Sequence, residues 1–137
     1  MKVFFDTSAI AKRYIDEIGT EIVIDICQKT TELYLCSICV PEFISVISRL
    51  KREGRITQSQ FNNIKKTFLV EIVDATILQI TPEIIINSVH LLEKYSLRTL
   101  DSLHISCGKL IKPDLFVSGD KRQLEAAMSE GLKIMSV

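Results

Sequence analysis

Short apolar runs alternate with longer segments of helical spacing along the whole chain, and this alternation narrows the choice of fold more than any other property. Short strands that alternate with helices are joined by parallel crossovers, which place helices on both faces of one sheet. The sequence therefore predicts a three-layer α/β/α fold with a parallel sheet. The apolar runs place its strands at Lys2–Phe5, Leu33–Cys36, Thr76–Ile80, Leu115–Val117 and Lys133–Met135.

The chain has the length and composition of one globular domain. Its 137 residues, 47% of them apolar and 25% charged, are enough to bury a hydrophobic core without disulfides. No linker rich in proline, glycine or serine interrupts the pattern. Residues 1–137 are therefore expected to form a single domain.

Two helical patterns follow one another between Val40 and Phe68 without a strand between them. This arrangement predicts a helical hairpin that projects beyond the sheet. Its apolar surface, which includes Ile44, Ile47 and Phe61, packs into the protein's own core or docks a helix of a partner.

The charge balance restricts the range of partners. Lys plus Arg and Asp plus Glu each number 17, so the formal net charge is zero. This balance argues against a broad basic surface that coats nucleic acid, and it leaves room for a local basic rim.

No apolar run reaches the roughly 18 residues that span a bilayer. Because Asp6 follows only three apolar residues, no signal peptide is expected, and the sequence favours a cytoplasmic protein without membrane attachment.

The cysteine and histidine residues do not form the pattern of a structural metal site. Cys36 and Cys39 form a CxxC pair, but no second pair follows, and a structural zinc site needs four ligands. His90 and His104 lie in otherwise apolar helical patterns. We expect all four cysteines to be buried free thiols: Cys27, Cys36, Cys39 and Cys107.

Four acidic residues occupy equivalent places in the predicted fold. Asp6 follows the first strand, Glu42 starts the helix after the second, Asp101 lies in the first turn of a later helix, and Asp120 follows the fourth strand. Each one alone is explained by helix capping. The carboxyl ends of parallel strands share one edge of the sheet, however, and four carboxylates there repel one another unless cations lie between them. Carboxylate oxygens are ligands that Mg²⁺ and Mn²⁺ prefer.

Other enzyme classes with an acid after the first strand do not fit. A dehalogenase-type phosphatase needs a second aspartate at the position of Ser8. The chain contains no glycine-rich dinucleotide fingerprint, no phosphate-binding loop of nucleoside triphosphatases and no nucleophile elbow.

The motifs in their order resemble those of PIN-domain ribonucleases, and the resemblance extends over essentially the whole chain. It rests on Asp6-Thr-Ser-Ala9, Glu42, the segment Arg98–His104 and the segment Ser118–Leu124. Among short members, the chain looks most like VapC-like toxins of type II toxin–antitoxin pairs. The resemblance implies a central parallel sheet of about five strands and an endoribonuclease that depends on Mg²⁺ or Mn²⁺. It also implies a homodimer, an RNA substrate and a small antitoxin partner.

The resemblance and the chemistry of the residues together suggest roles. Asp6, Glu42, Asp101 and Asp120 are the expected catalytic and metal-binding residues. Ser8 and Ser118 orient a ligand or the scissile phosphate, or cap helices. Four basic residues flank the acids and are candidates for contacts with RNA phosphates: Lys12, Arg98, Lys121 and Arg122.

Three questions stay open on the sequence. His104 is a hydrogen-bonded core residue, the expected case, or a ligand or general base. The enzyme is a toxin or a housekeeping nuclease without an antitoxin. A third alternative is a PIN-like module that only binds RNA or protein, but such modules usually lose acids, and all four are present here.

Overall fold

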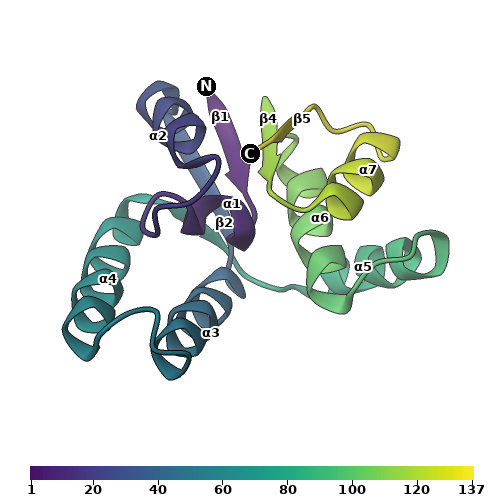
Figure 1. Cartoon of the computed structure of the whole chain (residues 1–137). Coiled ribbons are helices and arrows are strands. Elements are labelled where there is room, and N and C mark those ends of the chain that lie inside the picture. Colours follow the sequence, from purple (N-terminus) through teal and green to yellow (C-terminus); the bar gives the residue numbers. More distant parts are fainter.

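A computed structural model describes residues 1–137. Five strands form one sheet in the order β3-β2-β1-β4-β5, and every pairing is parallel (Figure 1). The three-layer prediction is confirmed, and the predicted strand ends differ from the observed ones by no more than two residues. The strands are β1 (Lys2–Phe5), β2 (Glu32–Cys36), β3 (Thr76–Leu78), β4 (Leu115–Ser118) and β5 (Ile134–Ser136).

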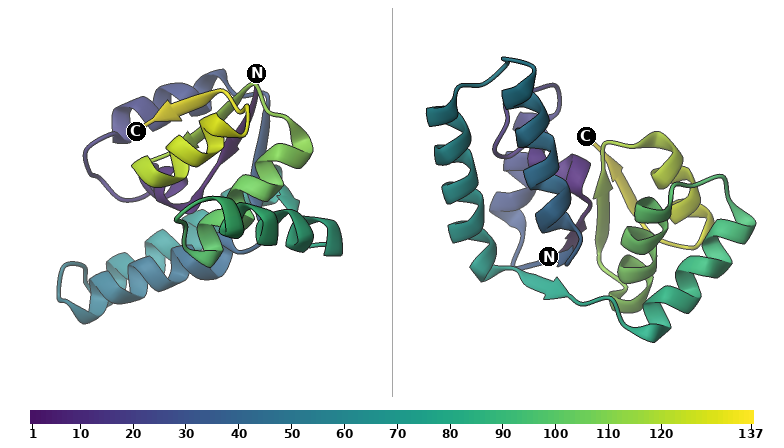
Figure 2. Two further views of the ribbon diagram at one scale, coloured as in Figure 1. Left: turned by 90° about the vertical axis from the view of Figure 1, so that its right-hand side faces the viewer. Right: turned by 90° about the horizontal axis from the view of Figure 1, so that it is seen from below.

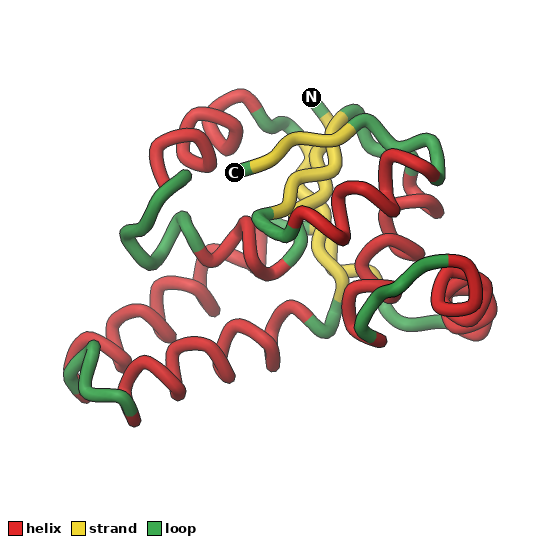
Figure 3. Tube along the Cα trace, turned by 45° about the vertical axis from the view of Figure 1, so that its right-hand side comes forward, coloured by secondary structure: helices red, strands yellow, loops and turns green.

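Helices cover both faces of the sheet. Figure 2 shows α1 to α4 on one side of the strands and α5 to α7 on the other, and Figure 3 shows the strands between the two groups. No helix is long and apolar enough to cross a bilayer. The helices are α1 (Thr7–Ala11), α2 (Thr20–Lys29), α3 (Cys39–Arg52), α4 (Gln58–Glu71), α5 (Pro82–Lys94), α6 (Thr99–Ile111) and α7 (Lys121–Ser129), with a short 3-10 helix, η1, at Ile72–Asp74.

The alternation of side chains along β1 divides the core in two. Val3 and Phe5 belong to a cluster under α1 to α4, whereas Phe4 belongs to a second cluster under α5 to α7. In the second cluster Phe4 stacks on Phe116 of β4, with ring centroids 5.2 Å apart. Successive residues of a strand point to opposite faces, so a strand covered on both sides is apolar at every position.

The predicted hairpin is present as α3 and α4. Phe43, Ile47 and Phe68 are completely buried, and the rings of Phe43 and Phe68 lie 4.0 Å apart. Ile44 and Phe61 are partly buried against the same cluster. The apolar face that the sequence offered as a docking surface is therefore packed in the protein's own core.

The strand order creates a crevice beside β1. From β1 the chain proceeds to β2 and β3 on one side and then returns to β4 and β5 on the other. In open parallel sheets, ligands bind at the carboxyl ends of the strands where this direction reverses. Asp6 follows β1 at that point, and Ser118 ends β4.

The cysteines are free thiols. Cys36, Cys39 and Cys107 are buried as expected, and Cys27 is half-buried. His90 lies on α5 among apolar residues, as expected, but its side chain is exposed. The neighbouring residues Ile86 and Val89 are also exposed, because only one stripe of α5 faces the sheet.

One carboxylate joins the ends of three helices. Glu130, directly after α7, accepts hydrogen bonds from Lys109 Nζ of α6 at 2.6 Å and from Tyr95 Oη at 2.6 Å. It also accepts one from Lys94 Nζ of α5 at 3.2 Å. The hydrogen bond from Lys109, followed by that from Tyr95, lowers the pKa of Glu130 to about 2. Its side chain is only 10% exposed.

We predict that Glu130→Gln lowers the free energy of unfolding by about 1 kcal/mol at pH 7. Because the folded-state pKa lies below the ordinary value, the ionised form stabilises the fold above about pH 4.5. This contribution is lost as the pH falls toward 2. Urea unfolding at pH 7, 4 and 2.5 measures the effect. Glu125→Gln, a substitution at an exposed position of α7, is the control, and equal pH profiles for both variants would contradict the prediction.

Candidate active site

Asp6 is a buried carboxylate at the start of α1. It caps the helix by accepting the Ala9 N–H at 2.8 Å, and the hydroxyls of Ser8 and Ser118 donate to it at 2.8 and 2.7 Å. The residue is 3% exposed, and Asp6 takes part in none of the ion pairs of the protein. Burial raises the pKa of Asp6, and the charge of His104 and the hydrogen bonds offset only part of this effect. A cation near Asp6 would therefore be stabilised.

The two serines also fix the loop between β4 and α7. Ser8 Oγ accepts the Gly119 N–H at 2.9 Å, and Ser118 Oγ accepts the Asp120 N–H at 2.9 Å. Of the two roles left open by the sequence, these contacts favour orientation of an acid, because neither hydroxyl caps a helix. They hold Asp6 and Asp120 at the same edge of the sheet.

Arg98 bridges two of the acids. Its Nε lies 3.0 Å from Asp101 Oδ2, and its Nη2 lies 3.3 Å from Asp120 Oδ2. Asp120 also caps α7 by accepting backbone N–H groups of Arg122 and Gln123. The predicted phosphate ligand Arg98 is thus paired with carboxylates in this structure, and its cation lies between Asp101 and Asp120.

Glu42 is held by a threonine and a histidine. Its Oε1 accepts the Thr7 hydroxyl at 2.7 Å and lies 2.6 Å from His104 Nε2. Burial lowers the pKa of His104, but the hydrogen bond to Glu42 and the charge of Asp6 outweigh it, so the pKa is raised. Burial raises the pKa of Glu42, yet His104 outweighs this and lowers it. His104 is 2% exposed, which confirms the hydrogen-bonded core position.

The four acids do not form a preassembled ligand cluster. No group of three or more His, Cys, Asp or Glu side chains is arranged to hold one metal ion. Instead Asp6 is bound by serines, Asp101 and Asp120 share Arg98, and Glu42 is bound by His104. The donor chemistry nevertheless suits a hard divalent ion, because these groups offer carboxylate and hydroxyl oxygens.

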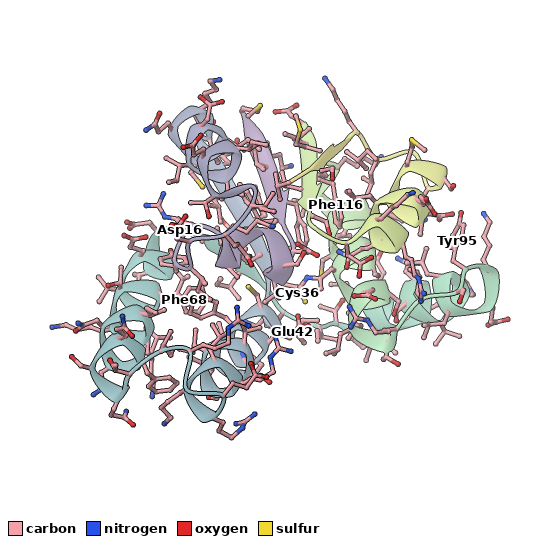
Figure 4. The ribbon with its side chains drawn as sticks, in the orientation of Figure 1. Asp16, Cys36, Glu42, Phe68, Tyr95 and Phe116 are labelled. Carbon is pink, nitrogen blue, oxygen red and sulfur yellow. The ribbon has the colours of Figure 1, made fainter.

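A cleft of about 680 Å³ opens beside these groups. Thr7 and Ser8 of α1 line one part, and Glu42, Ser45 and Arg49 line the part formed by α3. Figure 4 labels Glu42 near the middle of the molecule, at the end of α3 that is nearest to the helices of the opposite layer. Of the four acids only Glu42 lines the cleft.

The basic candidates have different positions. Lys12 lines the cleft, but its Nζ donates to the Ile18 carbonyl at 2.6 Å and lies 3.8 Å from Glu17. Lys121 and Arg122 are exposed on α7 and do not line the cleft. Of the four basic candidates, Lys12 and Arg98 therefore line the cleft, whereas Lys121 and Arg122 do not.

Sequence reasoning missed Thr7, Ser45 and Arg49. Thr7 lies inside the first motif, but its contact with Glu42 crosses 35 positions of sequence. Ser45 and Arg49 follow Glu42 by three and seven residues. That spacing places Glu42, Ser45 and Arg49 on one face of α3, and the sequence alone could have indicated it.

Comparisons with known proteins agree with this fold. A model of the PIN domain family matches residues 3–128. No curated protein matches the sequence. Several solved structures share the fold. The structure of FitAcB from Neisseria gonorrhoeae has a TM-score of 0.76 at 14% identity, covering 98% of this chain and 96% of that one.

Two further structures are similar over nearly the whole of both chains. VapC20 of Mycobacterium tuberculosis, described as a toxin that cleaves the sarcin–ricin loop, has a TM-score of 0.70 at 11% identity and 95% coverage of each chain. VapBC2 of Rickettsia felis, bound to a promoter DNA fragment, has a TM-score of 0.70 at 10% identity, covering 100% of this chain and 99% of that one. The family model, matched over most of the sequence, shows that this chain belongs to the PIN domain family.

Proposed function

We propose that the protein is an endoribonuclease that depends on a divalent metal ion, with Asp6, Glu42, Asp101 and Asp120 as the residues that hold Mg²⁺ or Mn²⁺. The observation that carries the proposal is Asp6, a buried carboxylate at the switch point of the sheet that forms no ion pair. Membership of the PIN family supports it. A bound divalent ion lowers the pKa of water and neutralises charge on the phosphodiester.

The surrounding residues position these acids. Ser8 and Ser118 hold Asp6, while Thr7 and His104 hold Glu42. Arg98 neutralises Asp101 and Asp120 in the structure, and its exposed side chain (77%) has room to turn toward an RNA phosphate when an ion takes that role. In-line attack of water on the phosphodiester would leave 5′-phosphate and 3′-hydroxyl ends.

We also propose that the nuclease is a toxin with a small antitoxin partner, and that it forms a homodimer. Support for the antitoxin partner comes from the similar structures, which include a toxin–antitoxin complex from Klebsiella pneumoniae with a TM-score of 0.67. A housekeeping nuclease without an antitoxin is the alternative.

Metal dependence is the first expected result. Single-stranded RNA is cleaved in Mg²⁺ or Mn²⁺ and is not cleaved in EDTA. The ion also raises the melting temperature, because it binds the folded chain better than the unfolded one. At an ion concentration of 100 times Kd, the free energy of unfolding increases by about 2.7 kcal/mol. Asp101→Asn should lose most of this thermal shift. Full cleavage by pure protein in EDTA would rule out the metal-dependent mechanism.

Asp6→Asn should reduce cleavage at least about 100-fold and leave the protein folded. The amide oxygen still accepts the Ala9 N–H, and removing an unpaired buried charge keeps or raises the melting temperature. Cleavage kinetics and thermal unfolding are measured together. Asp16→Asn, at an exposed position, is the matched control. A folded Asp6→Asn protein that cleaves RNA as fast as the wild type would contradict the catalytic role of Asp6.

The toxin assignment is tested by co-expression with the neighbouring reading frame. We expect expression of the chain alone to arrest growth and a small protein from the neighbouring frame to co-purify and inhibit cleavage. Size-exclusion chromatography with light scattering measures the oligomeric state of the free chain. If growth is unaffected and nothing co-purifies while RNA is still cleaved, the housekeeping alternative replaces the toxin.

A further inference from the structure

We infer that Arg49 binds a phosphate of the RNA substrate beyond the scissile bond and thereby directs the strand along α3. The inference deepens the proposed ribonuclease function and rests on it. It concerns a residue outside the motifs of the four acids.

Arg49 lies on the face of α3 that forms the cleft. Glu42, Ser45 and Arg49 all line the cleft, at intervals of three and four residues. An adjacent face of the helix is fixed in the core by Phe43 and Ile47. At 1.5 Å per residue, Arg49 is about 10 Å further along the helix axis than Glu42. A strand whose scissile phosphate lies at the acids would therefore present a neighbouring phosphate to Arg49.

Arg49 is the cleft's uncommitted cation. Three basic residues line the cleft, and Lys12 and Arg98 each form close hydrogen bonds within the protein. The ion-pair partner of Arg49 is Glu53, 3.9 Å away, and both side chains are largely exposed (60% and 48%). An exposed pair of this kind contributes little free energy, so a phosphate can replace Glu53 at small cost.

The rest of the lining makes a phosphate contact important. Ile38, Pro41, Val46 and Leu100 give the cleft an apolar part, and none of its lining residues is aromatic. Bases therefore cannot stack on aromatic rings there, which is a main source of affinity in other single-strand binders. With a net charge of zero there is no broad basic surface to compensate. Binding then depends on the few cations that reach the phosphates.

The other basic residues in the last turn of α3 provide the contrast. Lys51 Nζ lies 4.4 Å from the centroid of the Phe61 ring and is occupied by that contact. Arg52 is exposed and does not line the cleft. Arg52→Gln therefore removes the same charge from the same helix without touching the cleft.

The test measures binding of the full chain to a fluorescein-labelled single-stranded RNA by anisotropy, in EDTA, at a series of salt concentrations. Loss of one phosphate contact reduces the slope of log K against log salt by about 0.7. We expect this change, with several-fold weaker binding at low salt, for Arg49→Gln and not for Arg52→Gln. In cleavage assays Arg49→Gln should raise KM by a larger factor than it lowers kcat.

Two results would overturn the inference and leave the ribonuclease function intact. One is an unchanged slope for Arg49→Gln in a protein that binds and cleaves RNA. The other is an equal reduction of the slope for Arg49→Gln and Arg52→Gln. Such a result would indicate that RNA is attracted by the overall positive charge at the end of the hairpin. A wild-type chain that neither binds nor cleaves RNA would overturn the proposed function and this inference with it. Circular dichroism spectra of both variants serve as the check that they are folded.

Discussion

The arrangement of the site depends on the buried carboxylate of Asp6. It accepts hydrogen bonds from the backbone of α1 and from Ser118 at the end of β4, so one side chain joins two parts of the chain that are 112 positions apart. The backbone N–H of Asp6 continues the pairing of β1 with β4 by donating to Val117 at 3.0 Å. Burying an unpaired carboxylate costs free energy, and a structure retains such a group where a ligand or a reaction needs it.

The fold could be predicted because local and global signals agree. The two central strands carry apolar residues on both faces at Val3–Phe5 and Leu115–Val117. The second helix of the hairpin begins with a capping box in which Thr57 and Gln60 exchange hydrogen bonds with each other's backbone. The places of the four acids in the fold could also be predicted, because each one follows a strand or lies at the start of a helix.

The contacts within the site could not be predicted in this way. The bond between Glu42 and His104 spans 62 positions and depends on how α3 and α6 lie across the sheet. Arg98 was expected to face the substrate, but a guanidinium beside two carboxylates is stabilised by them in the absence of another cation. Lys12 is held by a backbone carbonyl, a partner that no pattern of side chains reveals. Spacing predicts which residues share an edge, whereas side-chain pairing depends on distances of a few ångströms.

The packing of α3 has a consequence for how this sequence can change. Glu42 and Arg49 are seven residues apart, and an ideal helix brings such residues to within about 20° of the same direction. Each inserted or deleted residue between them would rotate one against the other by about 100°, since a turn contains 3.6 residues. Phe43 and Ile47 fix the helix in the core, so the helix cannot turn as a whole to compensate. Exchanges at exposed positions of α3 outside the cleft, such as Arg52, are compatible with it, but a change in the number of residues between Glu42 and Arg49 is not.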